Sequence, residues 1–209
     1  MTQTTPAGKM PSDQRKAQIL RAATDLFAGG GYAGTSLRDV AEKCGMTKAA
    51  LYYHYPDKES LLKAVVASRM VRLNEAMETA LASVTEDDPL QRIRAFLLAC
   101  ARQIDNDRSG WVVGARIFWS IEAISDRTEM IELRDHFESL LRAQVSDAID
   151  RGILLPEDPG TVTRFLLSWL NYMPRWHRPG GRLSAEQVAD DFLRLSLQGL
   201  AVERAPAAT

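Results

Sequence analysis

The chain has 209 residues, of which 45% are hydrophobic and 25% charged, and its formal net charge is −1 at pH 7. This composition is typical of a globular protein with a sizeable core and argues against a disordered chain. Because no stretch approaches about 18 consecutive apolar residues, we expect no membrane span. The N-terminal segment lacks the apolar core of a secretory signal, and Cys44 and Cys100 lie far apart. We therefore expect a cytoplasmic protein without disulfides, membrane partner, bound metal or cofactor.

The first predicted helix covers residues 12–28. Ile19, Ala23 and Phe27 recur at a spacing of four, which places them on one face. Ser12 is expected to cap its start. The glycines at 29–31 are expected to end it, because glycine adopts positive φ at low steric cost.

Two short helices follow, one from Thr35-Ser36 to Gly45 and one over 48–54 that begins after Thr47. Their sequence meets the demands of a helix-turn-helix. The small Ala41 lets the two helices approach closely, Gly45 permits the turn, and Leu51 anchors the second helix in the core. The other face of the second helix then stays free for a DNA groove.

Asp57 is expected to cap a long helix over 58–83. Beyond it we expect five more helices, separated by turn residues, over 89–105, 109–123, 127–151, 158–173 and 184–202. The predicted fold is all-α with about nine helices. It divides into a DNA-binding head (12–60) and a helical body for ligand binding and dimerisation (61–204).

Residues 45–61 read GMTKAALYYHYPDKESL. This stretch resembles the heads of the TetR family of repressors, which typically read G-[VM]-[ST]-x-x-x-L-Y-x-[HY]-F-x-x-K-x-x-L, with Tyr55 here in place of the commoner Phe. The preceding GYAGTS at 31–36 is similar to the family's entry pattern. Residues 1–60 also carry more basic than acidic side chains, whereas the rest of the chain has the opposite balance, as suits a DNA-contacting head.

The resemblance implies that the head binds a double-stranded DNA operator. Phosphate contacts would position it, and specificity would come from the 47–53 face. Tyr52 and Tyr55 are expected to pack in the core. The DNA-binding residues that the resemblance implies are Thr35, Ser36, Thr47, Lys48, Ala49, Tyr53, His54 and Lys58.

For the body, the resemblance implies a homodimer formed through the last two helices and a pocket for a small hydrophobic effector. The segment WHRPGGRLS at 176–184 is similar to an element of a TetR subgroup that senses acyl-CoA thioesters in lipid and steroid breakdown. Arginine suits CoA phosphates, tryptophan can stack on adenine, and an acyl chain needs an apolar cavity. The candidate ligand-binding residues are Trp111, Phe118, Trp119, Phe137, Leu141, Phe165, Trp169, Arg175, Trp176 and Arg178.

Three alternatives stay open at this stage. Arginine is frequent throughout the chain, so the effector could equally be a lipophilic or aromatic compound without CoA, or there could be none. A helical interaction protein that does not bind DNA is a further alternative. We do not expect an enzyme, because the sequence contains no nucleophile elbow, P-loop or dinucleotide-binding fingerprint.

Overall fold

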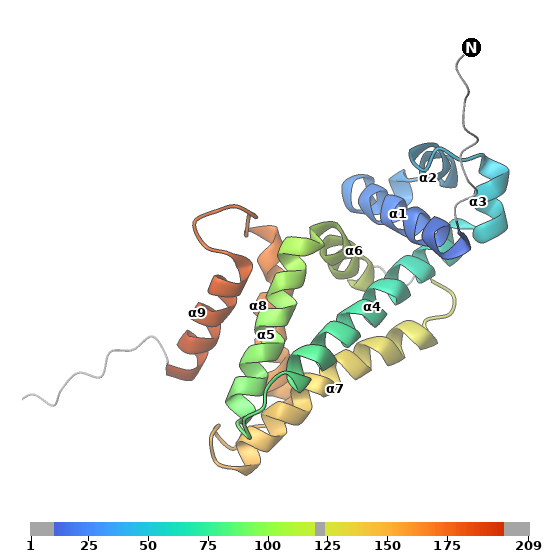
Figure 1. The fold of residues 1–209 in the computed structure, drawn as a ribbon. Coiled ribbons are helices and arrows are strands. Elements are labelled where there is room, and N and C mark those ends of the chain that lie inside the picture. The colour runs from blue at the N-terminus through green and yellow to red at the C-terminus, as the bar shows by residue number, and fades with distance from the viewer. Residues whose placement is uncertain (1–10, 120–123, 199–209) are drawn as a thin grey trace, which may run out of the picture.

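The structure is a computed structural model that describes residues 11–119 and 124–198. Within these ranges the chain forms nine α-helices and one 3₁₀ turn and contains no strand, which confirms the predicted all-α class. None of the helices described is both long and apolar enough to cross a bilayer. Figure 1 shows a small three-helix head at one end of a long helix and a larger helical body around the rest of that helix.

The head consists of α1 (Ser12–Gly34), α2 (Leu37–Lys43) and α3 (Lys48–His54). The first helix differs from the prediction at both ends. Ser12 already lies inside it and makes no capping hydrogen bond, because Pro11 occupies the cap position. Helical turns also continue past the glycines to Gly34, with a break only at Gly31, where φ is +75°. A single residue at positive φ therefore kinks the chain and does not end the helix.

The head and body share α4 (Lys58–Ala82), whose start is capped by Asp57 as predicted. Its first turns bury Leu61, Leu62 and Val65 in the head's core, and its later turns bury Leu73 and Met77 in the body's core. A helix thus joins the two parts. The head's core also takes in side chains from beyond α4, namely Val113, Ile124 and Met130, so the division of the domains at residue 60 stays a prediction.

The body helices agree closely with their predicted ranges. They are α5 (Pro89–Asn106), α6 (Arg108–Trp119), α7 (Thr128–Asp150), α8 (Pro159–Tyr172) and α9 (Ala185–Gln198). The predicted ends of α6 and α9, at residues 120–123 and 199–202, lie outside the described residues. Both α4 and α5 pack on α7, and α9 lies against the outer side of α5 (Figure 1).

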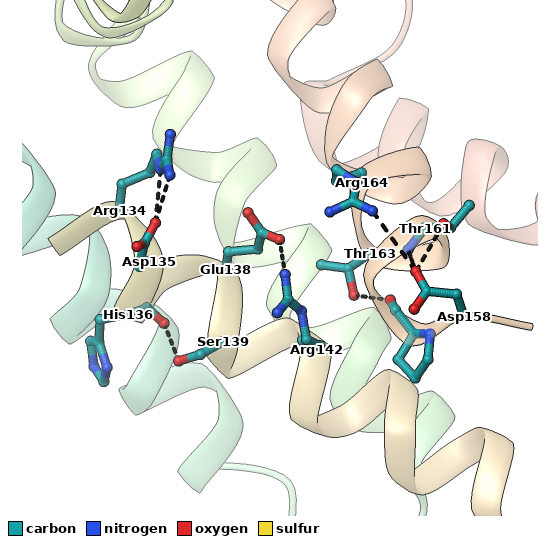
Figure 2. A network of polar contacts seen from close by, with 11 residues as sticks. Arg134, Asp135, His136, Glu138, Ser139, Arg142, Asp158, Thr161, Thr163 and Arg164 are labelled. Atoms are coloured by element: carbon teal, nitrogen blue, oxygen red, sulfur yellow. Dashed lines mark hydrogen bonds and ion pairs between the residues drawn. The ribbon is translucent and has the colours of Figure 1, made fainter. Parts of the chain in front are cut away.

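Helix α8 begins beside the middle of α7 (Figure 2). Asp158 caps it by accepting hydrogen bonds from the Thr161 backbone N–H at 2.6 Å and from the Thr161 hydroxyl at 2.9 Å. On α7 the facing surface carries the exposed ion pair of Glu138 with Arg142. The Asp158 cap fixes the start of α8, whereas the solvated ion pair on α7 adds little stability.

Candidate nucleic-acid interface

The turn between α2 and α3 is built by the residues that the sequence predicted. Ala41 is buried where the two helices meet, and its carbonyl accepts a hydrogen bond from the Met46 N–H at 3.0 Å. Gly45 adopts φ +63°, a conformation that disfavours any side chain. From α1, the Gln18 amide donates to the Cys44 carbonyl at 3.3 Å, which ties the turn to the head's core.

Helix α3 presents one apolar side to the core and the other side to solvent. Leu51 is fully buried, whereas Tyr53 is 87% exposed. Thr47 caps the helix by accepting a hydrogen bond from the Ala50 N–H at 3.2 Å. Thr47, Lys48 and Ala49 are all exposed, and His54 is partly exposed beside the Tyr53 ring. A duplex could therefore reach the face that carries the predicted base-reading residues.

One of the two tyrosines expected in the core does not lie there. Tyr55 is buried as predicted, and its burial raises its pKa. Tyr52 is 41% exposed, and the Lys48 ammonium lies 5.3 Å from the centre of its ring. The prediction for Tyr52 was wrong, because position 52 faces the opening between α3 and the start of α2.

That opening is a groove of about 440 Å³ lined by both predicted and unpredicted residues. Ser36 closes the start of α2 in a capping box with Asp39, which lowers the pKa of Asp39. The residues at the start of α2, Ser36, Leu37 and Arg38, therefore line one side of the groove. The groove is lined by Ala33, Gly34, Thr35, Ser36, Leu37, Arg38, Lys48, Tyr52, Pro56, Asp57 and Lys58.

Two of the predicted DNA-binding residues are engaged within the head itself. The Thr35 side chain is buried, and its hydroxyl donates to the Gly31 carbonyl at 2.9 Å. The Lys58 ammonium donates to the Tyr32 carbonyl at 2.9 Å and lies 4.3 Å from the centre of the Tyr32 ring. In this conformation the Thr35 hydroxyl cannot donate to a phosphate, and Lys58 offers only its remaining N–H donors.

The sequence reasoning did not single out Arg38, a cation on the same groove. It is the second residue of α2 and is largely exposed, and it pairs with Glu42 at 2.8 Å. The sequence could have indicated it, because a basic residue in the first turn after Thr35-Ser36, where the second helix was predicted to begin, lies at the helix start that a phosphate would approach. Arg38 and Lys48 are the two exposed cations of this groove within the described head.

Among the described residues, the predicted effector-binding side chains are divided between the core and the surface. Leu141 is fully buried in the body's core, and Phe137 packs on Phe96 with ring centres 5.1 Å apart. Phe165 is 57% exposed on α8. Trp111 alone among the predicted residues lines the cavity found between α4, α5 and α6. The side chains of Phe118 and Trp119 lie outside the described part of the chain.

The segment that follows α8 is held down by two residues that the prediction did not name. Pro174, which has no backbone N–H to continue the helix, lies in the 3₁₀ turn η2 (Met173–Arg175) that ends α8. The Arg108 guanidinium donates to the carbonyls of Pro174 and His177, at 2.8 and 2.7 Å. Asp105 accepts from the Ala185 N–H at 3.1 Å and lies 2.9 Å from the buried His177 ring.

The remaining predicted ligand residues of this segment point outward. Arg175, Trp176 and Arg178 are all exposed. Trp176 lies near Phe192 of α9, with ring centres 6.0 Å apart, and the Arg175 guanidinium lies 5.4 Å from the Tyr172 ring. These three side chains lie on the surface at the end of α8.

Within the described residues, no group of three His, Cys, Asp or Glu side chains is placed to hold a metal ion. Cys44 and Cys100 are buried as free thiols, and burial raises the pKa of both. In the described part of the chain, the arrangement best suited to a chemical role is thus the exposed α3 face with its adjoining groove.

Two family models match this chain. The model described as "Bacterial regulatory proteins, tetR family" matches residues 19–65, and that described as "Tetracyclin repressor-like, C-terminal domain" matches residues 86–200. The first match covers the helix-turn-helix and the second covers the body. Together the two matches correspond to the head and the body of the fold.

Solved structures and curated relatives are similar to this protein along most of its chain. The regulator PfmR from Thermus thermophilus superposes with a TM-score of 0.77 at 35% identity, over 88% of this chain and 99% of that chain. AibR in complex with isovaleryl coenzyme A and operator DNA gives a TM-score of 0.74 at 28% identity, over 87% and 97%. The HTH-type transcriptional repressor KstR2 of Mycolicibacterium smegmatis is 28% identical over 89% of this chain and 90% of the relative.

Proposed function

This chain belongs to the TetR family of transcriptional regulators, and from that premise we propose that it is a repressor. It binds a palindromic DNA operator as a homodimer and releases it when a small hydrophobic effector binds the body. Family membership confirms the prediction that the protein is a DNA-binding regulator, since the members of this family are regulators and not enzymes. The repressor acts in the cytoplasm, where it meets both the operator DNA and the effector.

The observation that carries the proposal is the exposed side of α3. Its buried side is fixed by Leu51, and its start is fixed by the Thr47 cap. The side chains of Lys48 and Tyr53 extend from this rigid support into solvent. Arg38 adds a second exposed cation at the adjoining groove. Contacts from such a helix to base edges would supply specificity, and the flanking cations would supply salt-dependent affinity.

Dimerisation through α8 and α9 has support from the surface of those helices. Phe165, Trp169 and Tyr172 recur at helical spacing along α8, and Phe165 and Tyr172 are more than half exposed. The Trp169 indole N–H is buried without a hydrogen-bond acceptor in the described part of the chain. Trp169 also packs on Phe192 of α9, with ring centres 5.2 Å apart. A second copy would cover this apolar face, and two such faces would pair the heads for a two-fold symmetric operator.

For the effector we propose an acyl-CoA thioester. AibR was solved with isovaleryl coenzyme A and operator DNA, and it is similar to this chain over most of its length. In this chain, Arg175, Trp176 and Arg178 are exposed next to the proposed dimer face. There a nucleotide could stack on the indole and pair its phosphates with the guanidinium groups.

The proposed switch uses the contact between α6 and the head. Val113 of α6 is buried in the head's core, and α6 packs on α1. A ligand that binds one arrangement of α6 more tightly than another would therefore favour one spacing of the two heads. Release follows when the favoured spacing no longer matches the two operator half-sites.

The test is a fluorescence anisotropy titration on an operator selected from a random DNA library. Lys48→Ala should weaken operator binding and should reduce the slope of log affinity against log salt by about one, because it removes one exposed positive charge at the groove. Arg102→Ala is a matched control, because it removes one exposed positive charge from the body. Equal salt slopes for Lys48→Ala and the wild type would refute the proposed interface. Unchanged operator affinity in the presence of saturating isovaleryl-CoA and longer acyl-CoA thioesters would refute the acyl-CoA effector.

A further inference from the structure

Arg69 of α4 is a partly buried cation without a carboxylate partner in the described part of the chain. Its guanidinium lies 4.8 Å from the centre of the Trp111 ring and donates to the Met70 sulfur at 3.7 Å. Among the described residues it forms no ion pair within 4.0 Å. Burial lowers its pKa to about 10. Most of its five N–H donors therefore lack an oxygen acceptor among these residues, which is costly away from water.

The nearby carboxylate is committed elsewhere. Asp107 accepts a hydrogen bond from the Gly110 N–H at 2.9 Å, which caps the start of α6, and it lies 3.9 Å from the Arg72 guanidinium. It reaches Arg69 only as a charge at longer range. An arginine kept for structure alone would be expected to have its donors satisfied, as Arg108 has.

The fold leaves room around the Arg69 guanidinium. Position 114 on α6 is glycine, and a Cβ there would lie only 2.9 Å from Arg69 Nη1. Beside the guanidinium is a cavity of about 20 Å³, lined by Arg69, Arg72, Leu73, Gln103, Asp107 and Trp111. This space is close to that of one water, so a larger group enters only if Arg72 or α6 moves aside.

We propose that Arg69 and Trp111 form a subsite for an oxyanion of the effector. The guanidinium fork binds the oxyanion, and the indole and Leu73 contact the adjoining apolar part of the ligand. A free carboxylic acid or the phosphates of a CoA thioester could supply this oxyanion. The inference rests on the proposed effector-controlled function and specifies the charged group that the effector must carry.

The position of the subsite also links it to the head. Trp111 and Gly114 face Arg69, whereas Val113 on the same helix is buried among head residues that include Phe27. An oxyanion that draws the guanidinium away from Gly114 changes the packing of α6. Because α6 packs on α1, this change reaches the DNA-binding head directly.

The experiment compares three probes that share one apolar chain: decanoate, decanoyl-CoA and methyl decanoate. Thermal shift and titration calorimetry are carried out on the wild type, Arg69→Met and the control Arg102→Met. We expect at least one anionic probe to bind the wild type more tightly than the neutral ester. Arg69→Met should lose about tenfold or more of that affinity, as fits one charge-assisted contact, while Arg102→Met retains it. Arg69→Lys should recover part of it, because it keeps the charge but loses the fork.

The two anionic probes distinguish the source of the oxyanion. Preference for decanoate assigns the subsite to a free acid, and preference for decanoyl-CoA assigns it to the CoA group. The proposal is overturned if the neutral ester binds as tightly as the anions, if Arg69→Met keeps the preference, or if no probe binds. Operator affinity without probe is measured in parallel. Normal DNA binding by both the wild type and Arg69→Met would leave the regulator function intact even where the subsite fails.

Discussion

Glu59, in the first turn of α4, accepts hydrogen bonds from the hydroxyl and the backbone N–H of Ser125, at 2.7 and 2.8 Å. Lys63, one turn further along α4, lies 3.2 Å from the same carboxylate. These contacts lower the pKa of Glu59 to about 2. The segment between α6 and α7 is thereby tied to the start of the helix that carries the head.

We expect Glu59→Gln to destabilise the protein at neutral pH and to have less effect in acid. A carboxylate whose pKa falls on folding stabilises the native state above its ordinary pKa of 4.5, and this contribution is lost as the pH falls toward 2. Urea titrations should therefore show the difference in unfolding free energy between wild type and variant shrinking across that window. A difference that stayed constant from neutral pH to about pH 3 would contradict this account.

Lys58→Met should destabilise the head by about 1 kcal/mol, because it removes the hydrogen bond to the Tyr32 carbonyl and the cation over the Tyr32 ring. Methionine retains most of the apolar packing. Urea unfolding measures the change, with Lys48→Met as a comparison on the exposed α3 face. If Lys58→Met were as stable as the wild type, the ammonium would be free to act purely as a phosphate ligand.

Phe165→Glu should convert the proposed dimer into a monomer by placing a charge on the apolar face of α8, where Phe165 is 57% exposed. Sedimentation velocity reports the subunit count directly. Ile131→Glu is the matched control, because Ile131 is 44% exposed on α7. A dimer that survived Phe165→Glu but not Ile131→Glu would move the interface to α7.

Asp105→Ala should lower the unfolding free energy by about 1–3 kcal/mol, because it leaves the buried His177 ring and the Ala185 N–H without their acceptor. Glu186→Ala removes a nearby exposed carboxylate that pairs with Arg102, and it should change stability by only about 0.5 kcal/mol or less. Equal effects in the two variants would show that Asp105 does not anchor the segment after α8.

The local structure of the head could be read from the sequence because its signals are local. The Thr47 and Asp57 caps, the Gly45 turn and the Leu51 anchor each depend on residues only a few positions apart. The same short-range chemistry explains why the helix ranges of the body agreed with their predictions. Ser12 was a misjudged cap because Pro11 occupies the cap position directly before it.

Tertiary packing decided which side chains are free to act. Tyr52 lines the groove between α2 and α3. The Thr35 hydroxyl is buried and donates to the Gly31 carbonyl, and the Lys58 ammonium donates to the Tyr32 carbonyl. The outcomes for Tyr52 and Lys58 do not follow from spacing along one helix, because they depend on how separate helices pack together. The predicted effector residues were dispersed for the same reason, since an aromatic residue at helical spacing packs equally well in a core, on a dimer face or around a ligand.

The sequence by itself thus determined the helical class, the helix-turn-helix and the family, since these depend on periodicity, caps and turn residues that act over short distances. Only the three-dimensional structure brought Arg69 of α4 against Trp111 and Gly114 of α6, and Asp105 against His177. Contacts between residues so distant along the chain arise from the packing of whole helices, which no local pattern encodes. The charged group proposed for the effector therefore rests on the tertiary structure.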